Sequence, residues 1–378
     1  MKILHFYKTT FPNSHGGVEQ VIHQVAYGCV SLKIDVDILS LSRVSKLSID
    51  SSYGYNSHFS RENFQIASNS FSFTVLSKFN ILASQADLIH YHFPWPFMDL
   101  IHFLAHHKKP TIVTYHSDIV SKGFLFEIYK PLMKIFLNDI DVIVATSKNY
   151  AKTSNVLTKY KNKVKVVPIG INPQDYVKPT PIIFKKWKNK IRSNFFLFVG
   201  VMRTYKAVEV ILNALKYESY PFVFVGDGPL LNNLKTLAKA LNLKNIYFVG
   251  EISDIDRNAL YKLCYGVVSS SNLRSEAYGV SLVEGLMYGK PLVSTNIGTG
   301  TTFINKDKVT GIVIPPNNPK KLAEALRFLW SNPQIKKNYG INSKKRFKKY
   351  FTAKMMNKSY LHIYQSILMN KKTNKLKN

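Results

Sequence analysis

Cysteine is nearly absent from this chain: the 378 residues include two, Cys29 and Cys264, far apart in the sequence. Their scarcity excludes a disulfide framework and a cysteine-based zinc site. No apolar run reaches the ~18–20 residues of a membrane-spanning helix, and the apolar stretch at the N-terminus is too short for a signal peptide. We therefore expect a cytosolic protein. Because 46% of the residues are hydrophobic, a wholly disordered chain is also excluded.

Acidic residues are also scarce, since 22 Asp and Glu stand against 52 Lys and Arg, which gives a formal net charge of +30. Such an excess indicates an anionic partner, which can be nucleic acid, a membrane surface or a phosphorylated substrate. The cations gather in residues 159–192 and 336–377, and no acid follows Glu324. This clustering favours an anion-binding surface. The alternative is that lysine is simply the common solvated residue of this chain.

Short apolar segments alternate with helix-length periodic segments in both halves of the chain. We predict strands at residues 2–7, 35–39, 87–90, 111–115, 141–145, 164–168, 195–199, 222–225, 246–249, 266–270, 291–294 and 311–314. We predict helices at residues 18–30, 98–107, 124–138, 148–159, 207–216, 230–241, 256–264, 280–288 and 320–330. Strands that are apolar throughout and are connected by helices are typical of a parallel sheet covered on both faces.

The alternation stops between residues 172 and 194, where prolines and lysines indicate a linker. We therefore predict two doubly wound α/β domains: an N-terminal Rossmann-like domain at 1–172, a basic linker at 173–194 and a second Rossmann-like domain at 195–350. Residues 351–378 would form a C-terminal helix, packed back on the N-terminal domain, and a basic tail. Ligands of such sheets bind at the carboxyl ends of the strands, so two facing domains would surround one cleft.

Polar motifs follow two neighbouring strands of the second half. Arg203 and Lys206 come after the strand at 195–199, at a helix start, where two cations and free backbone amides suit a pyrophosphate. A pair of ordinary surface cations is the alternative. After the next strand, Gly226 and Gly228 resemble half of a dinucleotide-binding fingerprint. A tight turn before a helix explains these two glycines equally well.

Two carboxylates flank a further helix start. Glu276 precedes the helix predicted at 280–288, and Glu284 lies inside it between apolar neighbours. Gly279 and Val280 stand at its N-terminus, where unpaired amides can face an anion. Because carboxylates repel phosphate, the two acids are better suited to accept hydrogen bonds from sugar and ribose hydroxyls. The alternative is a helix cap followed by a solvated glutamate.

The first half carries its own candidates at strand ends. Gly16 and Gly17 precede an amphipathic helix and allow another molecule to approach the backbone closely. His116 ends the strand at 111–115, at the mouth of the expected cleft, where a polar catalytic or binding group belongs. A flexible loop and a structural histidine are the respective alternatives.

Metal binding has little support in the sequence. His90 and His92 form a His-x-His pair, but no third ligand is suggested, so we expect no metal site. Asp35 and Asp37 form a D-x-D pair, which in other enzymes holds a metal with a diphosphate. Here the pair begins an apolar strand, and we interpret it as a strand edge.

Taken in order, these motifs resemble the retaining glycosyltransferases of family 4, which have the GT-B architecture of two Rossmann-like domains facing a shared cleft. The resemblance covers nearly the whole chain and includes Gly289-Lys290-Pro291 and the segment at 166–172. Glu276-x7-Glu284 together with the upstream Arg203 and Lys206 is its specific part. Departures from the family pattern leave the charged groups intact; they are Ala207, Tyr278, Ser269 and Ser270.

The resemblance implies a role for each candidate of the second half. Arg203 and Lys206 would bind the donor diphosphate and stabilise the leaving nucleotide, as electrostatic stabilisation of developing charge requires. The amides of Gly279 and Val280 would contact the phosphate. Such enzymes need no metal and no cofactor beyond the nucleotide-sugar cosubstrate.

The remaining candidates would hold the sugar and the acceptor. Glu276 would bind the hydroxyls of the donor sugar, and Glu284 would bind the ribose. Gly16 and Gly17 would pack against the diphosphate, and His116 would contact the sugar and acceptor near the reacting carbon. On this resemblance we count His116, Glu276 and the two cations as catalytic.

We therefore expect a retaining, metal-independent hexosyltransferase. The first-half motifs also look like those of bacterial mannosyltransferases that build O-antigen or capsule repeats. This favours GDP-mannose as donor and a polyprenyl-diphosphate-linked saccharide as acceptor. The alternatives are a GT-B transferase that uses a UDP-sugar, a nucleotide-sugar epimerase, and a basic nucleic-acid-binding protein, although no recognised nucleic-acid module is present.

The two basic stretches suggest a place for the reaction. Aromatic residues lie between the cations of the second stretch and beside it: Trp330, Phe347, Tyr350, Phe351 and Tyr360. Cations interleaved with aromatic residues fit peripheral contact with anionic lipid at the inner face of the cytoplasmic membrane.

Overall fold

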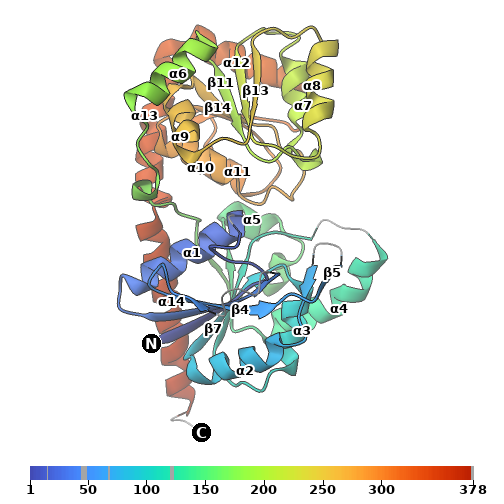
Figure 1. Cartoon of the computed structure of the whole chain (residues 1–378), viewed down its shortest axis with the longest axis vertical. Coiled ribbons are helices and arrows are strands. Elements are labelled where there is room, and N and C mark those ends of the chain that lie inside the picture. The colour runs from blue at the N-terminus through green and yellow to red at the C-terminus, as the bar shows by residue number, and fades with distance from the viewer. Residues whose placement is uncertain (15, 44–48, 67–68, 120–122, 376–378) are drawn as a thin grey trace. The chain divides into compact units, whose positions relative to one another are not determined.

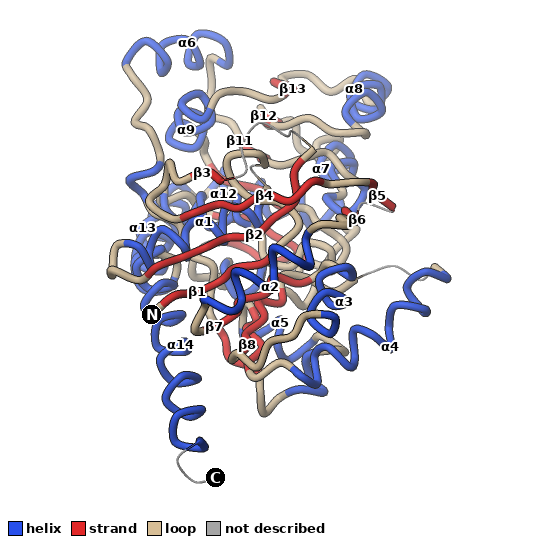
Figure 2. The backbone as a smooth tube through the Cα atoms, turned by 60° about the horizontal axis from the view of Figure 1, so that its bottom comes forward, coloured by secondary structure: helices blue, strands red, loops and turns tan. Residues whose placement is uncertain are grey.

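The computed structural model describes residues 1–14, 16–43, 49–66, 69–119 and 123–375 (Figures 1 and 2). The chain divides into two compact units. Unit 1 comprises Met1–Thr146, Ala151–Gly170 and Ala353–Asn378. Unit 2 comprises Ser147–Tyr150 and Ile171–Thr352. No helix in the described part of the chain combines the length and the hydropathy that crossing a membrane requires.

Unit 1 is built on a sheet with the strand order β10-β9-β8-β7-β1-β2-β4-β3, in which β3 runs antiparallel to β4 and the other pairs are parallel. A separate antiparallel pair, β5 and β6, lies in the same unit. The bounds are β1 (Lys2–Phe6), β2 (Asp35–Ser42), β3 (Ile49–Asp50), β4 (Asn56–Arg61), β5 (Phe64–Ile66), β6 (Asn69–Phe71), β7 (Leu88–Phe93), β8 (Thr111–Tyr115), β9 (Val142–Ala145) and β10 (Val164–Val166).

The helices of unit 1 come from both ends of the chain. They are α1 (Gly17–Val30), α2 (Val75–Gln85), α3 (Pro96–Leu104), α4 (Phe124–Asp139), the short turn η1 (Leu157–Tyr160) and α14 (Ala353–Lys375), while α5 (Lys148–Thr153) is divided between the units. Helix α14 packs against α1. Gly28 permits this contact, because a Cβ there would overlap the side chain of Asn357.

Unit 2 is built on a fully parallel sheet with the order β13-β12-β11-β14-β15-β16. The first strand of the unit, β11, therefore lies at the centre, and the direction of winding reverses between β11 and β14. The bounds are β11 (Phe196–Val199), β12 (Phe222–Val225), β13 (Ile246–Gly250), β14 (Gly266–Ser269), β15 (Leu292–Thr295) and β16 (Gly311–Ile314). This is the doubly wound order of dinucleotide-binding folds.

Helices cover the second sheet and complete its core. They are η2 (Pro173–Asp175), α6 (Pro181–Ile191), η3 (Thr204–Lys206), α7 (Val208–Ala214), α8 (Leu231–Ala240), α9 (Asp254–Leu263), α10 (Val280–Met287), α11 (Gly300–Ile304), α12 (Pro319–Ser331) and α13 (Pro333–Tyr350). Apolar side chains of β11, β12, α7 and α12 form one cluster that excludes water; it includes Phe196, Phe222, Leu212 and Leu326. Burial of this cluster is the main stabilising contribution within the unit.

The segment at 173–194 is more than the expected linker, because it contains α6 and belongs to unit 2. The Thr180 hydroxyl caps this helix by accepting from the Ile183 amide at 3.5 Å, and Pro181 takes the first helical position. Trp187 is buried, and its indole N–H donates to Asp256 of α9 at 2.7 Å. The buried apolar face of α6 is narrow and lies between lysines. The composition of the segment therefore suggested a linker.

Candidate functional site

A buried ion pair lies at the reversal point of unit 2. Lys206 ends η3, which follows β11, and Glu276 lies in the loop after the neighbouring strand β14. The structure brings the two predicted residues into direct contact, with Lys206 Nζ bonded to Glu276 Oε2. Open α/β sheets bind their ligands at such a reversal point. The pair therefore marks the candidate site of this unit.

Electrostatics favours the charged form of Lys206. The side chains of Lys206 and Glu276 are 13% and 9% exposed. Burial alone would lower the pKa of Lys206, but the Glu276 carboxylate and Tyr205 together outweigh burial and raise the pKa above its ordinary value. Ser271 donates its hydroxyl to the same carboxylate oxygen at 3.0 Å. No side chain in the described ranges hydrogen-bonds Oε1 of Glu276, which leaves that oxygen able to accept from a ligand hydroxyl.

Hydrogen bonds between the two loops fix the position of the cation. The Ser270 hydroxyl donates to the backbone carbonyl of Lys206 at 2.8 Å, and the backbone N–H of Asn272 donates to the backbone carbonyl of Tyr205 at 3.0 Å. Because these bonds join the loops that follow β11 and β14, the ion pair is held from both sides before any ligand binds.

Arg203 shares a loop with Lys206 but lies outside the ion pair. Its side chain is exposed and makes no hydrogen bond or ion pair with a residue that the structure describes. Next to Lys206, Ala207 has a φ of +47°, in the left-handed region that glycine enters more easily than alanine. This accounts for the glycine that the family pattern has at the position of Ala207.

Packing accounts for the two glycines after β12. At Gly226, with a φ of +122°, an added Cβ would overlap the Gly200 carbonyl. At Gly228, with a φ of +150°, it would lie 2.7 Å from the backbone nitrogen of Met202. The loop after β12 thus packs closely on the loop that carries Arg203. The tight-turn interpretation explains these glycines without a ligand.

Gly279 and Val280 lie at the start of α10, as predicted. Gly279 has a φ of +98° and occupies the N-cap position, so Val280 is the first helical residue. The amides of a first helical turn have no partner within their own helix, and the helix dipole adds positive potential there. The N-terminal end of α10 is therefore suited to bind an anion.

Glu284 is held by a second set of partners. It lies within α10, is buried, and accepts from the hydroxyls of Tyr176 at 3.0 Å and Tyr261 at 2.6 Å. The Arg257 guanidinium lies 3.9 Å away. Burial, together with the Glu284 carboxylate, raises the pKa of both tyrosines well above its ordinary value, so both stay hydrogen-bond donors. Sequence reasoning missed all three partners, of which Tyr176 lies in the supposed linker.

Gly16 and Gly17 begin α1 in unit 1, and their surroundings differ. The Glu19 carboxylate folds back beside Gly16 and accepts from the hydroxyls of Thr9 at 2.6 Å and Ser14 at 3.0 Å. A Cβ at Gly16 would overlap that carboxylate, whereas a Cβ at Gly17 would meet no described atom within 4 Å. A side chain at Gly16 would therefore displace the Glu19 carboxylate, and Gly17 lies against open space.

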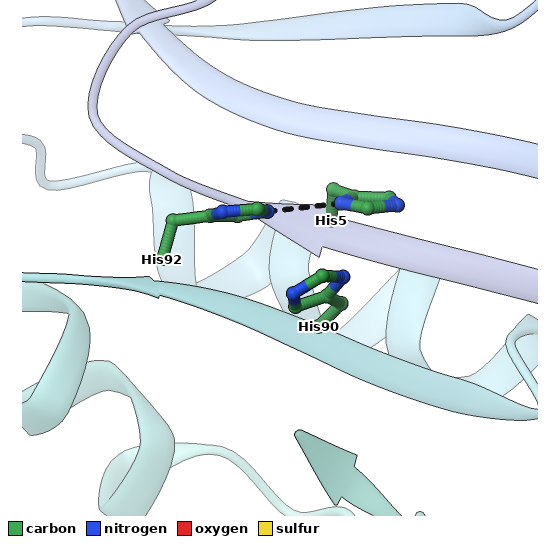
Figure 3. A group of neighbouring side chains, drawn as sticks. All are labelled: His5, His90 and His92. Atoms are coloured by element: carbon green, nitrogen blue, oxygen red, sulfur yellow. Dashed lines mark hydrogen bonds between the residues drawn. The ribbon is translucent and has the colours of Figure 1, made fainter. Parts of the chain in front are cut away.

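His116 follows β8 in unit 1 and is one of a group of buried histidines. Figure 3 shows the other three, His5, His90 and His92, whose ring nitrogens lie within 4.8 Å of one another. Sequence reasoning had no signal for His5, because only the pairing of β1 with β7 places it opposite His90. Such spacing would suit a metal ion, but both nitrogens of His90 are bonded to hydroxyl groups. Our expectation of a metal-free site stays a prediction.

Burial keeps these histidines neutral. It lowers the pKa of His5 and His116 to about 3. It also lowers the pKa of His90 and His92 well below 6.5, and the neighbouring imidazoles add to the effect. Neutral imidazoles each carry one donor and one acceptor, so they can hydrogen-bond one another.

The D-x-D pair has a structural role. Asp37 lies in β2, forms an ion pair with Lys2 at 2.8 Å and is hydrogen-bonded to His58 at 2.9 Å. Burial opposes its ionisation, but hydrogen bonds from His58, Lys2 and Asn56 outweigh burial and lower the pKa of Asp37 to about 2. The pair lies at the beginning of its strand, and β2 itself is an inner strand between β1 and β4.

The surface differs from the expected one in its aromatic residues. Phe347, Phe351 and Tyr360 are buried, so the expectation that they meet lipid is wrong. Their positions in α13, after it and in α14 reflect packing. Exposed lysines remain on α6 and α13: Lys185, Lys186, Lys188, Lys190, Lys337, Lys344, Lys345, Lys348 and Lys349. Exposed apolar side chains occur on several elements, and four of them lie on α4: Phe124 (80%), Leu125 (62%), Ile128 (59%) and Ile135 (55%).

Comparison with known proteins identifies relatives along the whole chain. The family model "Glycosyltransferase Family 4" matches residues 15–175, and "Glycosyl transferases group 1" matches residues 180–346. The chain is 46% identical over 353 residues to D-rhamnosyltransferase WbpZ of Pseudomonas aeruginosa, covering 93% of each chain. It is 41% identical over 371 residues to O-antigen chain mannosyltransferase C of Escherichia coli, covering 98% of this chain and 100% of that one.

A solved structure matches the fold. Sucrose-phosphate synthase from Thermosynechococcus elongatus superimposes with a TM-score of 0.82 at 17% identity, covering 98% of this chain and 99% of that one. At this identity the match shows the fold alone.

The neutral histidines predict a loss of stability in acid. Below pH 6.5 the unfolded chain protonates His5, His90, His92 and His116, while the folded unit keeps them neutral to a much lower pH, about 3 for His5 and His116. The free energy of unfolding should therefore fall as the pH falls, by about 1.4 kcal/mol per pH unit for each histidine. Urea unfolding at several pH values measures the slope. His5→Phe should flatten it and the exposed control His362→Phe should not; equal slopes in both variants would contradict the assignment.

Proposed function

This chain belongs to glycosyltransferase family 4, and we propose that it transfers a hexose from a nucleotide sugar to a lipid-linked saccharide with retention of configuration. Membership makes it a hexosyltransferase with the GT-B architecture of two parallel-sheet α/β units. The observation that carries the proposal is the buried pair of Lys206 and Glu276 at the reversal point of unit 2.

We assign the binding of the donor diphosphate to the cations of unit 2. Cleavage of the sugar–phosphate bond leaves negative charge on the nucleoside diphosphate. Lys206 is fixed and charged, Arg203 is exposed on the same loop, and α10 begins at Val280. Positive groups that are fixed before the reaction stabilise developing charge without reorganisation. In this proposal they stabilise the leaving group, and neither a metal ion nor a further cofactor is needed.

We assign the binding of the donor sugar and the ribose to the carboxylates. Glu276 uses Oε2 to hold Lys206, so its Oε1 is assigned to the hydroxyls of the donor sugar. Glu284, oriented by Tyr176 and Tyr261, is assigned to the ribose through its remaining lone pairs. In unit 1, His116 is assigned to the sugar near the reacting carbon, and Gly16 and Gly17 to the diphosphate. Retention requires that the acceptor hydroxyl attack from the face that the leaving group departs.

The names of the relatives limit the number of candidate donors and acceptors. One is named an O-antigen chain mannosyltransferase and the other a D-rhamnosyltransferase, and D-rhamnose is 6-deoxymannose. We therefore favour GDP-mannose as donor and a polyprenyl-diphosphate-linked saccharide as acceptor, in bacterial surface polysaccharide synthesis. The rhamnosyltransferase relative, at 46% identity, supports GDP-linked 6-deoxymannose as the second candidate donor. A UDP-sugar transferase and a nucleotide-sugar epimerase remain as outcomes of the test.

A donor screen tests the proposal. A ligand that binds the folded state alone raises the melting temperature, so GDP-mannose should stabilise the protein more than UDP- or ADP-sugars do. With a lipid-linked acceptor, the product should carry the same anomeric configuration as the donor by NMR, and EDTA should not slow its formation. Isomerisation of the donor without any acceptor would instead identify an epimerase.

Loss of a cation should lower turnover. Arg203→Ala removes an exposed side chain without described partners, so kcat should fall on the order of 100-fold while the melting temperature stays unchanged. Lys206→Ala should lower kcat as strongly and also destabilise the protein, because it leaves Glu276 buried and unpaired. Lys235→Ala, on the exposed face of α8, is the control. Wild-type kcat in Arg203→Ala and in Lys206→Ala would remove the two cations from the mechanism.

We further propose that the protein acts at the cytoplasmic face of the membrane. The exposed apolar side chains of α4 alternate with Lys130 and Lys134, as in helices that lie in a lipid interface. Lys130 and Lys134 of the same helix would attract anionic headgroups. In unit 2, the exposed lysines of α6 and α13 would attract such headgroups independently. We propose that α4 contacts the membrane in which a lipid-linked acceptor is embedded.

Vesicle sedimentation checks the membrane proposal. Phosphatidylglycerol vesicles should pull the protein down at low salt and release most of it at high salt, because salt screens the lysines. Leu125→Ser with Ile128→Ser should weaken binding at every salt concentration, since both side chains are more than half exposed. The apolar control is Leu32→Ser, exposed after α1. Equal binding by both variants, or none to anionic vesicles, would refute the surface.

A further inference from the structure

The register of three neighbouring strands in unit 1 gathers histidines on one face of the sheet. His5 of β1 pairs with His90 of β7, and His92 of β7 pairs with Thr114 of β8. Side chains alternate between faces along a strand, so His90 and His92 share a face, and His116 continues the face of Thr114. The sheet order places β1, β7 and β8 side by side.

Hydrogen bonds connect three of these histidines into a chain. His5 Nδ1 lies 3.0 Å from His92 Nε2, the contact drawn in Figure 3. His92 Nδ1 lies 3.1 Å from His116 Nε2. The rings of consecutive members are stacked, with centroids 5.3 Å and 5.4 Å apart. The chain therefore runs from the interior of the sheet to the candidate site residue His116.

His90 lies beside the chain but takes no part in it. Its Nδ1 is 2.8 Å from the Tyr364 hydroxyl, and its Nε2 is 2.7 Å from the Thr114 hydroxyl. Tyr360 of α14 completes this second network with a bond to Thr114 at 2.8 Å. Because both nitrogens of His90 are occupied by hydroxyls, His90 provides an internal control for the chain.

The ends of the chain decide where the protons lie. Each neutral imidazole has one N–H and one acceptor nitrogen, so the protons can point toward His116 or toward His5. His5 Nε2 is buried and has no partner among the described residues. If the protons pointed toward His5, this nitrogen would carry a buried N–H with nothing to donate to. Among backbone groups, orphaned buried N–H donors are rarer in native proteins than unpaired acceptors. We apply the same preference to the imidazole nitrogens, and it favours the opposite direction.

We propose that His92 and His5 are positioning residues that hold His116 in the tautomer with its proton on Nδ1. His5 Nδ1–H donates to His92, and His92 Nδ1–H donates to Nε2 of His116. His116 therefore offers an N–H donor and no free base. That this donor meets the sugar rests on the proposed function; the tautomer itself does not.

A basic nitrogen at His116 would remove a proton from a hydroxyl, whereas an N–H can only donate to an oxygen. The proposal thus assigns His116 to binding and orienting oxygen atoms. It also assigns a purpose to a fully buried polar chain, since an unpaired imidazole there would cost stability.

NMR of the full-length protein labelled with ¹⁵N-histidine tests the tautomer directly. Long-range ¹H–¹⁵N correlations, recorded in EDTA and assigned by single histidine substitutions, distinguish the protonated nitrogen of each ring. His5, His92 and His116 should each show a protonated Nδ1 and an unprotonated Nε2. A proton on Nε2 of His116, a charged His116 at neutral pH, or a pattern that changes on EDTA removal of a metal would overturn the proposal.

Variants separate positioning from packing. His92→Phe removes both hydrogen bonds, so His116 should lose its single tautomer and kcat should fall about tenfold. His92→Asn keeps an amide N–H close to the place of Nδ1 and should restore both properties in part. The control His90→Phe, equally buried on the same strand, should lower stability without changing the His116 tautomer. An equal change of tautomer in His90→Phe and His92→Phe would contradict the chain.

The two proposals fail separately. Should His92→Phe not fold, the wild-type spectrum alone still decides the tautomer. Absence of sugar transfer with the expected His116 spectrum would refute the proposed function and leave the chain intact. Normal sugar transfer together with a proton on Nε2 of His116 would refute the histidine chain and leave the proposed function intact.

Discussion

The ion pair of Lys206 and Glu276 is the interaction on which the rest of this account depends. Taking two charges out of water is costly, and removing one partner of a buried pair costs about 3–5 kcal/mol. Here the sheet order supplies the pairing, because β11 and β14 are neighbours and each is followed by one of the two residues. Hydrogen bonds between the two loops then fix the cation where an open sheet binds its ligand.

Much of the fold was predictable because buried parallel strands are apolar throughout. The strands at 111–115, 222–225 and 311–314 were predicted to the residue. The helix predicted at 148–159 instead ends at Thr153, because the Ser154 hydroxyl bonds the amides of Val156 and Leu157. Strands β3 to β6 and helix α2 were not predicted, since their short and partly exposed segments lack a clear period.

The positions of the candidate residues at strand ends were predictable, but their partners were not. Strand ends followed by charged residues or glycine indicated Lys206, Glu276 and Gly279, and all three lie at the carboxyl edge of the second sheet. The tyrosines that hold Glu284 come from segments 108 and 23 residues away, and His5 reaches His92 from 87 residues away. Such contacts depend on strand order, which a single sequence does not state. The aromatic residues at the C-terminal end show the opposite kind of error. Their spacing between lysines was interpreted as a lipid-binding pattern, but the side chains are buried.

Calorimetric titration with GDP tests the central claim most directly, with Lys206→Met, Glu276→Gln and the double variant compared in one cycle. The neutral replacements keep the side-chain volumes, and only the double variant removes both charges, so it controls for the lone buried charge that each single variant leaves. The account predicts that Lys206→Met weakens GDP binding about tenfold or more, and that Glu276→Gln leaves GDP binding intact while weakening GDP-mannose. Wild-type affinity for GDP in Lys206→Met would contradict the account.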